Sequence, residues 1–117
     1  MWEVEFTDQF GEWWSELSEE EQEEIDARIA LLERRGPSLG RPLVDAITSS
    51  RHSNMKELRA GSIRILFAFD PRRVAILLIG GDKREDWDGW YEVAVPQADD
   101  LFDEHLRELQ EEELSDG

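Results

Sequence analysis

The pattern of apolar and polar positions divides the chain into a helical first part, a strand-rich middle and a helical end. Residues 2–6 alternate apolar and acidic side chains, which is typical of a short, half-buried strand. The apolar positions that follow have the spacing i, i+3, i+4, i+7, which predicts one face of a helix capped by Thr7 or Asp8. These positions are Phe10, Trp13, Trp14 and Leu17.

A second helix is predicted to begin at Ser18 and to end before Gly36. Glu21 follows Ser18 at the spacing of a capping box, in which the two side chains satisfy free N–H groups at the helix start. Gly36 and Pro37 stop the helix, because proline cannot continue it and glycine suits a helix end. We expect the two helices to form an antiparallel hairpin. The apolar positions of the second helix are Ile25, Ile29 and Leu32.

Three strands are predicted in the middle of the chain, after a loop over residues 36–53 that is rich in Gly, Pro and Ser. A short turn of helix is expected within this loop, at Val44–Ile47. Tight turns at residues 60–61 and 70–73 connect the strands. The third strand is apolar throughout, as a central strand covered on both faces would be. The strands are Met55–Arg59, Ser62–Phe69 and Val74–Ile79.

The C-terminal part is expected to hold a polar, aromatic loop, a short edge strand and one helix. Val93 and Val95 indicate the edge strand, and Pro96 suits the first turn of the helix that follows. The acidic segment 110–117 is expected to be frayed. The elements together predict a single α+β domain over residues 1–117. Its N-terminal strand and helical hairpin pack on a small antiparallel sheet, and a C-terminal helix completes it.

The composition indicates a folded, soluble protein, because 39% of its 117 residues are hydrophobic and five are Trp. The chain has no cysteine, which excludes a disulfide, a thiol nucleophile and a thiolate metal site. Its first residues lack the basic and apolar regions of a signal peptide. The longest apolar run, Val74–Ile79, is too short to span a bilayer. We therefore expect a cytoplasmic protein with no membrane partner.

Charge is strongly segregated along the chain, whose net charge is −16. Residues 51–84, the basic segment, carry eight Lys and Arg against three acids, whereas the other residues carry five Arg against 26 acids. The expected strands lie mostly within this segment. A sheet that presents cations in an otherwise acidic protein is a place to look for phosphate chemistry.

Several pieces of the chain match a known family when they are taken in order. They are MKELR, then IRILFAFDPRRVAILLIGGDK after a short turn, and later WYEVAVPQADDLFDEHLREL. This set resembles the RelE/HigB superfamily of bacterial toxins, and in particular its phage-derived HigB-like branch. The resemblance covers the chain from about Trp2 to Leu109 and is strongest over residues 55–83.

The resemblance implies a RelE-like fold, a compact sheet with helices on one side. It implies cleavage of mRNA, usually on the ribosome. It also implies restraint by a cognate antitoxin, which in this branch is typically a helix-turn-helix protein. No metal or organic cofactor is expected.

RNA cleavage without a metal uses the substrate's own 2′-hydroxyl as nucleophile and leaves a 2′,3′-cyclic phosphate. A base removes the hydroxyl proton, cations stabilise the charged phosphorane, and an acid protonates the leaving 5′-oxygen. Arginine presents a planar fork that suits phosphate. The basic segment supplies four candidate catalytic cations, which are Lys56, Arg59, Arg64 and Lys83.

Each of these four cations also has a structural interpretation. Arg64 could pair with an acid on a helix, and Arg59 could pair with Glu57 of its own strand. Lys56 is two positions before Leu58 in the expected strand, so its side chain would point towards the core with that of Leu58. A bulge could turn it outward, or it could be a lysine at the sheet edge whose ammonium group reaches solvent. Lys83 follows two glycines, which permit a close ligand or a sharp turn, but it could be a solvated loop residue.

The candidate acids and bases are Tyr91 and His105. Some relatives use a tyrosine near this position, and a histidine titrates near neutral pH. His105 lies on the apolar stripe of the last helix, where a lone histidine is usually a core residue. His52 in the loop has a comparable claim.

Further residues are expected to bind RNA around the site. Arg72 and Arg73 at a hairpin tip could contact phosphates of the messenger or the ribosome, or could simply be solvated, and Arg84 is a fallback for Lys83. Aromatic residues before the last helix could stack on bases, although packing in the core or an interface is the commoner role. These residues are Arg72, Arg73, Arg84 and Trp90, with Trp87 beside them.

The sequence therefore favours the toxin of a type II toxin–antitoxin pair that cleaves mRNA at the ribosome. One alternative is a ParE-type gyrase poison, and another is a non-catalytic module that only binds an antitoxin. Contacts with phosphates help these toxins to associate with the ribosome, and the net charge of −16 weakens the long-range attraction to RNA.

Overall fold

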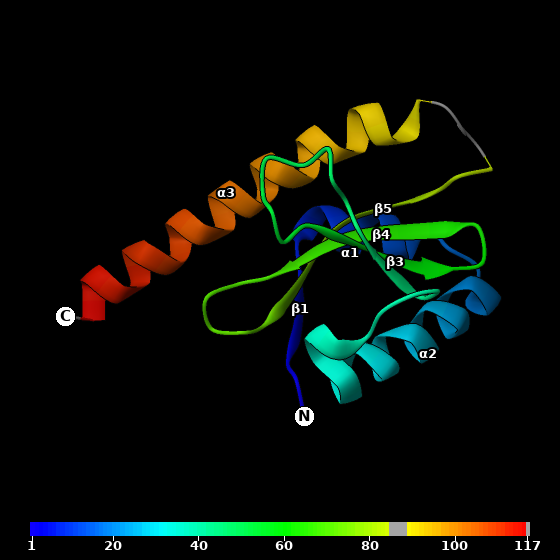
Figure 1. Cartoon of the computed structure of the whole chain (residues 1–117), viewed down its shortest axis with the longest axis horizontal. Helices are drawn as coiled ribbons and strands as arrows, with labels where there is room; N and C mark the ends of the chain where they lie inside the picture. Colours follow the sequence, from blue (N-terminus) through cyan, green and yellow to red (C-terminus); the bar gives the residue numbers. More distant parts are fainter. Residues whose placement is uncertain (85–88, 117) are drawn as a thin grey trace.

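The computed structural model describes residues 1–84 and 89–116, and it shows one sheet with helices on both of its faces (Figure 1). The prediction of helices on one side is therefore wrong. The elements in chain order are β1 Val4–Phe6, α1 Asp8–Ser15, α2 Glu19–Arg35, the 3-10 turn η1 Gly36–Ser38, β2 Val44–Ala46, β3 Lys56–Ala60, β4 Ile63–Phe69, β5 Ala75–Asp82 and α3 Trp90–Asp116.

The sheet has five strands in the order β1-β5-β4-β3-β2. The pairs from β2 to β5 are antiparallel as predicted, whereas β1 runs parallel to β5 at the edge. Alternation along β5 sends Leu77 to the face covered by α1 and α2, and Ile76 and Leu78 to the face covered by α3. The prediction that this strand is covered on both faces is confirmed.

The predicted starts of the first two helices are confirmed. The hydroxyl of Thr7 accepts a hydrogen bond from the N–H of Phe10 at 3.1 Å, so Thr7 caps α1. Ser18 and Glu21 form the capping box of α2, with both reciprocal bonds present. Each bond satisfies a donor that the helix itself leaves free.

Two predicted elements are wrong. Val44–Ala46 is a strand and not a turn of helix, because it pairs with β3 in the register Val44↔Leu58. Val93 and Val95 do not form an edge strand, since α3 begins at Trp90 and exposes Val93 at 60% while burying Val95. The two valines lie on different sides of α3, one towards solvent and one towards the sheet.

Pro96 accordingly lies inside α3 instead of in its first turn. Proline removes one hydrogen bond from a helix interior, and here packing of Ala94, Val95 and Ala98 against the sheet holds the segment. The helix also continues through Asp116, so the acidic segment in which we expected fraying is helical as far as it is described. Within residues 1–84 and 89–116, no helix is both long enough and apolar enough to cross a membrane.

Gly80 and Gly81 lie inside β5, where each accepts a tryptophan ring on a different face. A Cβ on Gly80 would stand 2.3 Å from the Trp13 ring of α1. A Cβ on Gly81 would stand 2.1 Å from Nε1 of Trp90, at the start of α3. The two glycines therefore make room for the indole rings of Trp13 and Trp90. They do not form the sharp turn that the sequence also allowed. This packing fixes the first turn of α3 against the sheet.

Candidate active site

Two arginines and a tyrosine of the predicted site converge on the carboxylate of Glu57. Nη2 of Arg59 lies 3.0 Å from Oε2 of Glu57, and Nε of Arg64 lies 3.6 Å from Oε1. The hydroxyl of Tyr91 donates to Oε1 of Glu57 at 2.5 Å. Asp45 completes this group, the Glu57 cluster, with an oxygen 3.3 Å from Nη2 of Arg59.

Strand register explains the convergence. Glu57 and Arg59 are two positions apart on β3, so they share one face. Arg64 stands opposite Arg59 in the antiparallel pair of β3 and β4. The same face is covered by α3, whose first turn carries Tyr91 over the strands. With Asp45 on β2, four separate elements therefore supply the cluster, and Figure 1 shows β3, β4 and α3 among them.

The cluster is largely sheltered from solvent. Glu57 is 5% exposed, and the side chain of Arg64 is 15% exposed. A buried carboxylate needs paired charges and hydrogen bonds, and the two arginines and the phenol supply them here. Conversely, two arginines facing each other across a strand pair would repel without the carboxylate beside them.

These contacts raise the pKa values of Arg59 and Tyr91. The hydrogen bond to Glu57 is the largest cause that raises the pKa of Arg59 above its usual value. Burial, followed by the hydrogen bond to Glu57, raises the pKa of Tyr91 to about 12. The phenol of Tyr91 is therefore protonated and neutral at physiological pH.

The two arginines keep an unused hydrogen-bonding capacity. Nε of Arg59 and Nε of Arg64 are buried without a hydrogen-bond partner in the described part of the chain. Nη1 of Arg64 is held by the carbonyl oxygens of Gly61 and Ile63, at 2.6 and 3.0 Å. Unsatisfied buried donors are uncommon and destabilising, and they call for a functional or structural explanation.

Lys83 lies beside the cluster at the end of β5. Its backbone N–H donates to the carbonyl oxygen of Ser62 at 3.0 Å, and its Nζ lies 5.4 Å from the centre of the Tyr91 ring. Arg84 instead folds back on Asp82, with Nη2 2.7 Å from the carboxylate. The Arg84 hydrogen bond lowers the pKa of Asp82 to about 2.

Lys56 lies outside the Glu57 cluster. Lys56 is two positions before Leu58 on β3, so both side chains point to the α1–α2 face. There the Nζ of Lys56 is 5.7 Å from the centre of the Phe69 ring. The register shift of the sheet falls between Leu66 and Phe67 and leaves β3 regular. No bulge turns Lys56 outward.

His105 is also remote from the cluster, because Tyr91 and His105 are separated by about 21 Å along α3 at 1.5 Å per residue. Nε2 of His105 lies 2.8 Å from Oδ2 of Asp70. Arg72 binds the same carboxylate at 2.7 Å and reaches Glu5 at 2.9 Å. This second group, the Asp70 cluster, ties β1, the β4–β5 turn and α3 together.

The remaining candidates contact protein groups. Arg73 stacks 5.4 Å from the Trp2 ring, and Trp90 packs on Gly81 and edge-on to Tyr91. His52 is fixed to α3 through Asp103, with Nε2 2.7 Å from the carboxylate. Trp87 lies outside the described residues.

Sequence reasoning treated Glu57 only as an ion-pair partner and missed Asp45. The signal for Glu57 was present, since the alternation in Lys56–Ala60 places it on the face of Arg59. Asp45 gave no comparable signal, because β2 was not recognised. In the described part of the chain, no group of three or more His, Asp or Glu side chains could hold a metal ion.

Solved structures define the class of fold. The RelB–RelE antitoxin–toxin complex from Methanococcus jannaschii matches with a TM-score of 0.58 and 13% identity, over 73% of this chain and 96% of that one. The toxin–antitoxin complex RelBE2 from Mycobacterium tuberculosis matches with a TM-score of 0.56 and 14% identity, over 69% and 96%. The protein has the RelE-like α+β fold, as the sequence predicted.

Sequence comparisons define the family. The family model described as phage derived protein Gp49-like matches residues 12–103, so the chain belongs to this family. HigB2 of Mycobacterium tuberculosis, named as a toxin, is 48% identical over 85% of this chain, which spans only 52% of HigB2. HigB3 of the same organism, also named as a toxin, is 53% identical over 78% of this chain and 82% of its own length. The predicted resemblance to the RelE/HigB superfamily and its phage-derived HigB-like branch is confirmed.

Proposed function

We propose that this protein is the toxin of a type II toxin–antitoxin pair and cleaves mRNA at the ribosome without a metal. The observation that carries the proposal is the convergence of Arg59, Arg64 and Tyr91 on the buried carboxylate of Glu57. Convergent guanidinium groups suit a phosphorane, and a carboxylate beside them can take a proton.

Glu57 is the proposed general base. When an RNA phosphate enters between Arg59 and Arg64, Glu57 takes the proton of the 2′-hydroxyl. The freed oxygen attacks the phosphorus, and the bond to the 5′-oxygen breaks. The two arginines, whose Nε groups have no hydrogen-bond partner among the described residues, stabilise the charge on the non-bridging oxygens.

Tyr91 is the proposed general acid, and Lys83 is a second cation beside it. The phenol gives its proton to the leaving 5′-oxygen, so the products are a 2′,3′-cyclic phosphate and a 5′-hydroxyl. Glu57 then holds a proton and Tyr91 lacks one. Because the two side chains are 2.5 Å apart, the proton can return directly and restore the starting state.

The proposed partners are a cognate antitoxin, of the helix-turn-helix type, and the translating ribosome with its mRNA. The proposed location is the cytoplasm. The likeness to RelE proteins solved with RelB supports an antitoxin.

A non-catalytic, protein-binding function is the second candidate. The observation in its favour is that Glu57 and Asp45 already occupy Arg59, so RNA must displace carboxylates from the site. The net charge of −16 adds a long-range repulsion against RNA. A ParE-type gyrase poison belongs to this class.

Expression of the wild-type chain and of Arg64→Ala in bacteria, with mRNA ends mapped by primer extension, tests the proposal. We expect cleavage by the wild type, and a loss of about 10²–10³-fold in Arg64→Ala. Intact mRNA with inhibited supercoiling would support the gyrase alternative, and equal cleavage by both chains would exclude Arg64 from the chemistry.

A further inference from the structure

β1 leaves one edge of the sheet open. The N–H of Thr7 donates to the carbonyl oxygen of Leu77, and the N–H of Ala75 donates to the carbonyl oxygen of Glu3. In a parallel ladder the bonding direction alternates, so the N–H and C=O groups of Val4 and Phe6 point away from β5. An edge with such groups can accept a further strand.

One face of β1 borders an apolar groove of about 280 Å³. Phe6 forms its outer wall and is 64% exposed, which is unusual for a large apolar side chain. Behind it lie Phe10 and Trp14 of α1 and Ile29 of α2. Side chains on this face of an added strand would meet a mainly apolar surface, with Asp26 and Glu33 of α2 also lining the groove.

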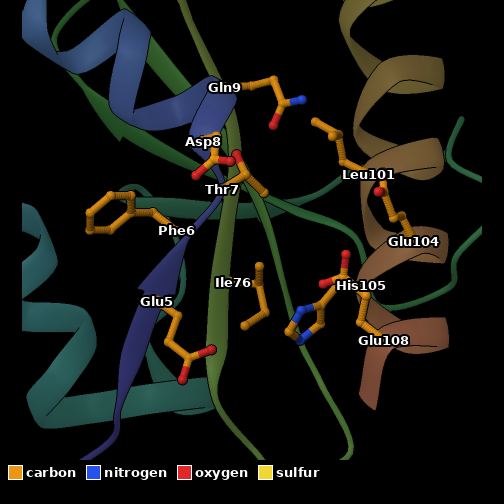
Figure 2. A pocket seen from close by; sticks show the side chains of 10 residues that line it. All are labelled: Glu5, Phe6, Thr7, Asp8, Gln9, Ile76, Leu101, Glu104, His105 and Glu108. Atoms are coloured by element: carbon orange, nitrogen blue, oxygen red, sulfur yellow. The ribbon is translucent and has the colours of Figure 1, made fainter. Parts of the chain in front are cut away.

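The opposite face of β1 borders a hollow of about 240 Å³ whose rim is acidic. Figure 2 shows Glu5 and Asp8 on the side of β1 and α1, and Glu104, His105 and Glu108 on the side of α3. In the described part of the chain, Asp8, Glu104 and Glu108 take part in no ion pair. Long basic side chains on this face of an added strand would find unpaired carboxylates.

We propose that β1 is a docking strand for an extended segment of a partner protein, in which apolar and basic side chains alternate. Successive side chains of a strand point to opposite faces, so one set enters the apolar groove and the other reaches the acidic hollow. The backbone of the segment pairs with Val4 and Phe6. Pairing of this kind supplies affinity, and the alternate side chains supply specificity.

Charge argues against a second copy of this chain as the occupant. Two copies with a net charge of −16 each repel, and the alternate residues of β1 and of the position before it are acidic and not basic, Glu5 and Glu3. A basic segment gains from both the local rim and the overall charge. The surface is separate from the Glu57 cluster, so the inference does not need RNA cleavage; only the naming of the antitoxin as the partner would rest on the proposed function.

Binding of short, end-capped peptides to the full-length protein tests the inference. The probe alternates valine and lysine; one control alternates valine and glutamate, and another alternates serine and lysine. We expect the first to bind at least about tenfold more tightly than either control. Amide exchange read by NMR should show new protection at Val4 and Phe6. Unchanged exchange at both amides, or equal binding of the three peptides, would overturn the proposal.

Protein variants separate the two faces. Phe6→Ser should weaken binding by removing the wall of the apolar groove, and the pair Glu104→Lys with Glu108→Lys should weaken it by reversing the rim. The pair Glu12→Lys with Glu23→Lys changes net charge equally at exposed positions that line neither hollow, and should bind nearly as the wild type does. Equal losses in both charge-reversed pairs would show general electrostatic attraction and contradict docking. Sedimentation that shows a dimer disrupted by Phe6→Ser would identify a second copy as the occupant and would also contradict it.

Discussion

The hydroxyl of Tyr91 donates a 2.5 Å hydrogen bond to Oε1 of Glu57, and this bond joins the first turn of α3 to the β3–β4 pair. Glu57 is buried and Tyr91 is partly buried, and their side chains form a donor–acceptor pair. The carboxylate gains a donor in a buried place, and the phenol gains an acceptor. In the proposed reaction the same bond is the route by which the proton returns.

Tyr91 is the only tyrosine of the chain, so its ionisation can be followed directly by tyrosinate absorbance. We expect titration near pH 12, because burial and the hydrogen bond to Glu57 raise its pKa to about 12. Stability from this group is present below the unfolded pKa near 10 and is lost as the pH rises through about 12. Glu57→Gln should lower the titration midpoint. A midpoint near 10 in the wild type would contradict the bond.

Glu57→Gln should separate RNA binding from RNA cleavage. Glutamine keeps the shape but removes the negative charge between two arginines, so we expect tighter RNA binding. Loss of the proposed base should lower the cleavage rate by about 10²–10⁴-fold. Filter binding and single-turnover cleavage measure the two effects. A variant that cleaves at the wild-type rate would exclude Glu57 as the base.

His105→Asn should leave the cleavage rate near that of the wild type, because His105 belongs to the Asp70 cluster and not to the Glu57 cluster. Asparagine can still donate to Asp70, which limits the structural damage. The same single-turnover assay applies, with Arg64→Ala as the variant expected to be impaired. A large loss of rate at unchanged thermal stability would show that His105 acts in the chemistry.

Gly81→Ala should destabilise the fold by about 1–3 kcal/mol, because the new methyl group meets the Trp90 ring in a packed interface. Gly40→Ala is the matched control, since its Cβ would meet nothing within 4 Å, and a change within about 0.5 kcal/mol is expected there. Urea denaturation measures both. Equal stability of the two variants would mean that Trp90 does not pack on β5 in solution.

Asp70→Asn should destabilise the protein by about 1–3 kcal/mol at neutral pH, because it weakens a buried hydrogen-bonded network. Burial alone would raise the pKa of Asp70, but hydrogen bonds from His105 and Arg72 outweigh it and hold the pKa below its ordinary 3.8. The stabilisation is therefore present above about pH 3.8 and is lost as the pH falls through the folded pKa.

Thermal unfolding of Asp70→Asn and the wild type across this acid range tests the linkage, and the difference in Tm should shrink as the pH falls. Asp100→Asn is the control, because its pair with Arg51 has a carboxylate that is 80% exposed. Exposed pairs contribute little, so its Tm should stay close to that of the wild type. A difference for Asp70→Asn that is independent of pH would show that its charge does not matter.

The parts of the fold with local signals could be predicted from the sequence. The capping box of Ser18 and Glu21 depends on neighbouring residues only, as does the alternation of β4. β2 could not be found in this way, because three residues in a strand are stabilised by pairing with β3 and not by their own pattern. The start of α3 was missed since Val93 and Val95 fit a period of two as well as a helical face.

The candidate site shows the same division. Arg59, Arg64 and Tyr91 were expected near one another, and strand register does bring them together. His105 was placed with them because its chemistry suited the reaction, yet the rise along α3 carries it to the far end of the sheet. Residue type indicated which side chains could take part in the reaction. Which of them lie close together was determined by the strand register and by the length of α3.

Gly80 and Gly81 give the sheet an unusual property at one place. Adjacent peptide units are all that separates the Trp13 ring on one face from the Trp90 ring on the other. At these two glycines no side chain of β5 lies between the two rings. A displacement of α1 would therefore be transmitted through the strand backbone to the first turn of α3. Since Tyr91 directly follows Trp90, the position of the proposed proton donor depends on how the N-terminal helix packs on the sheet.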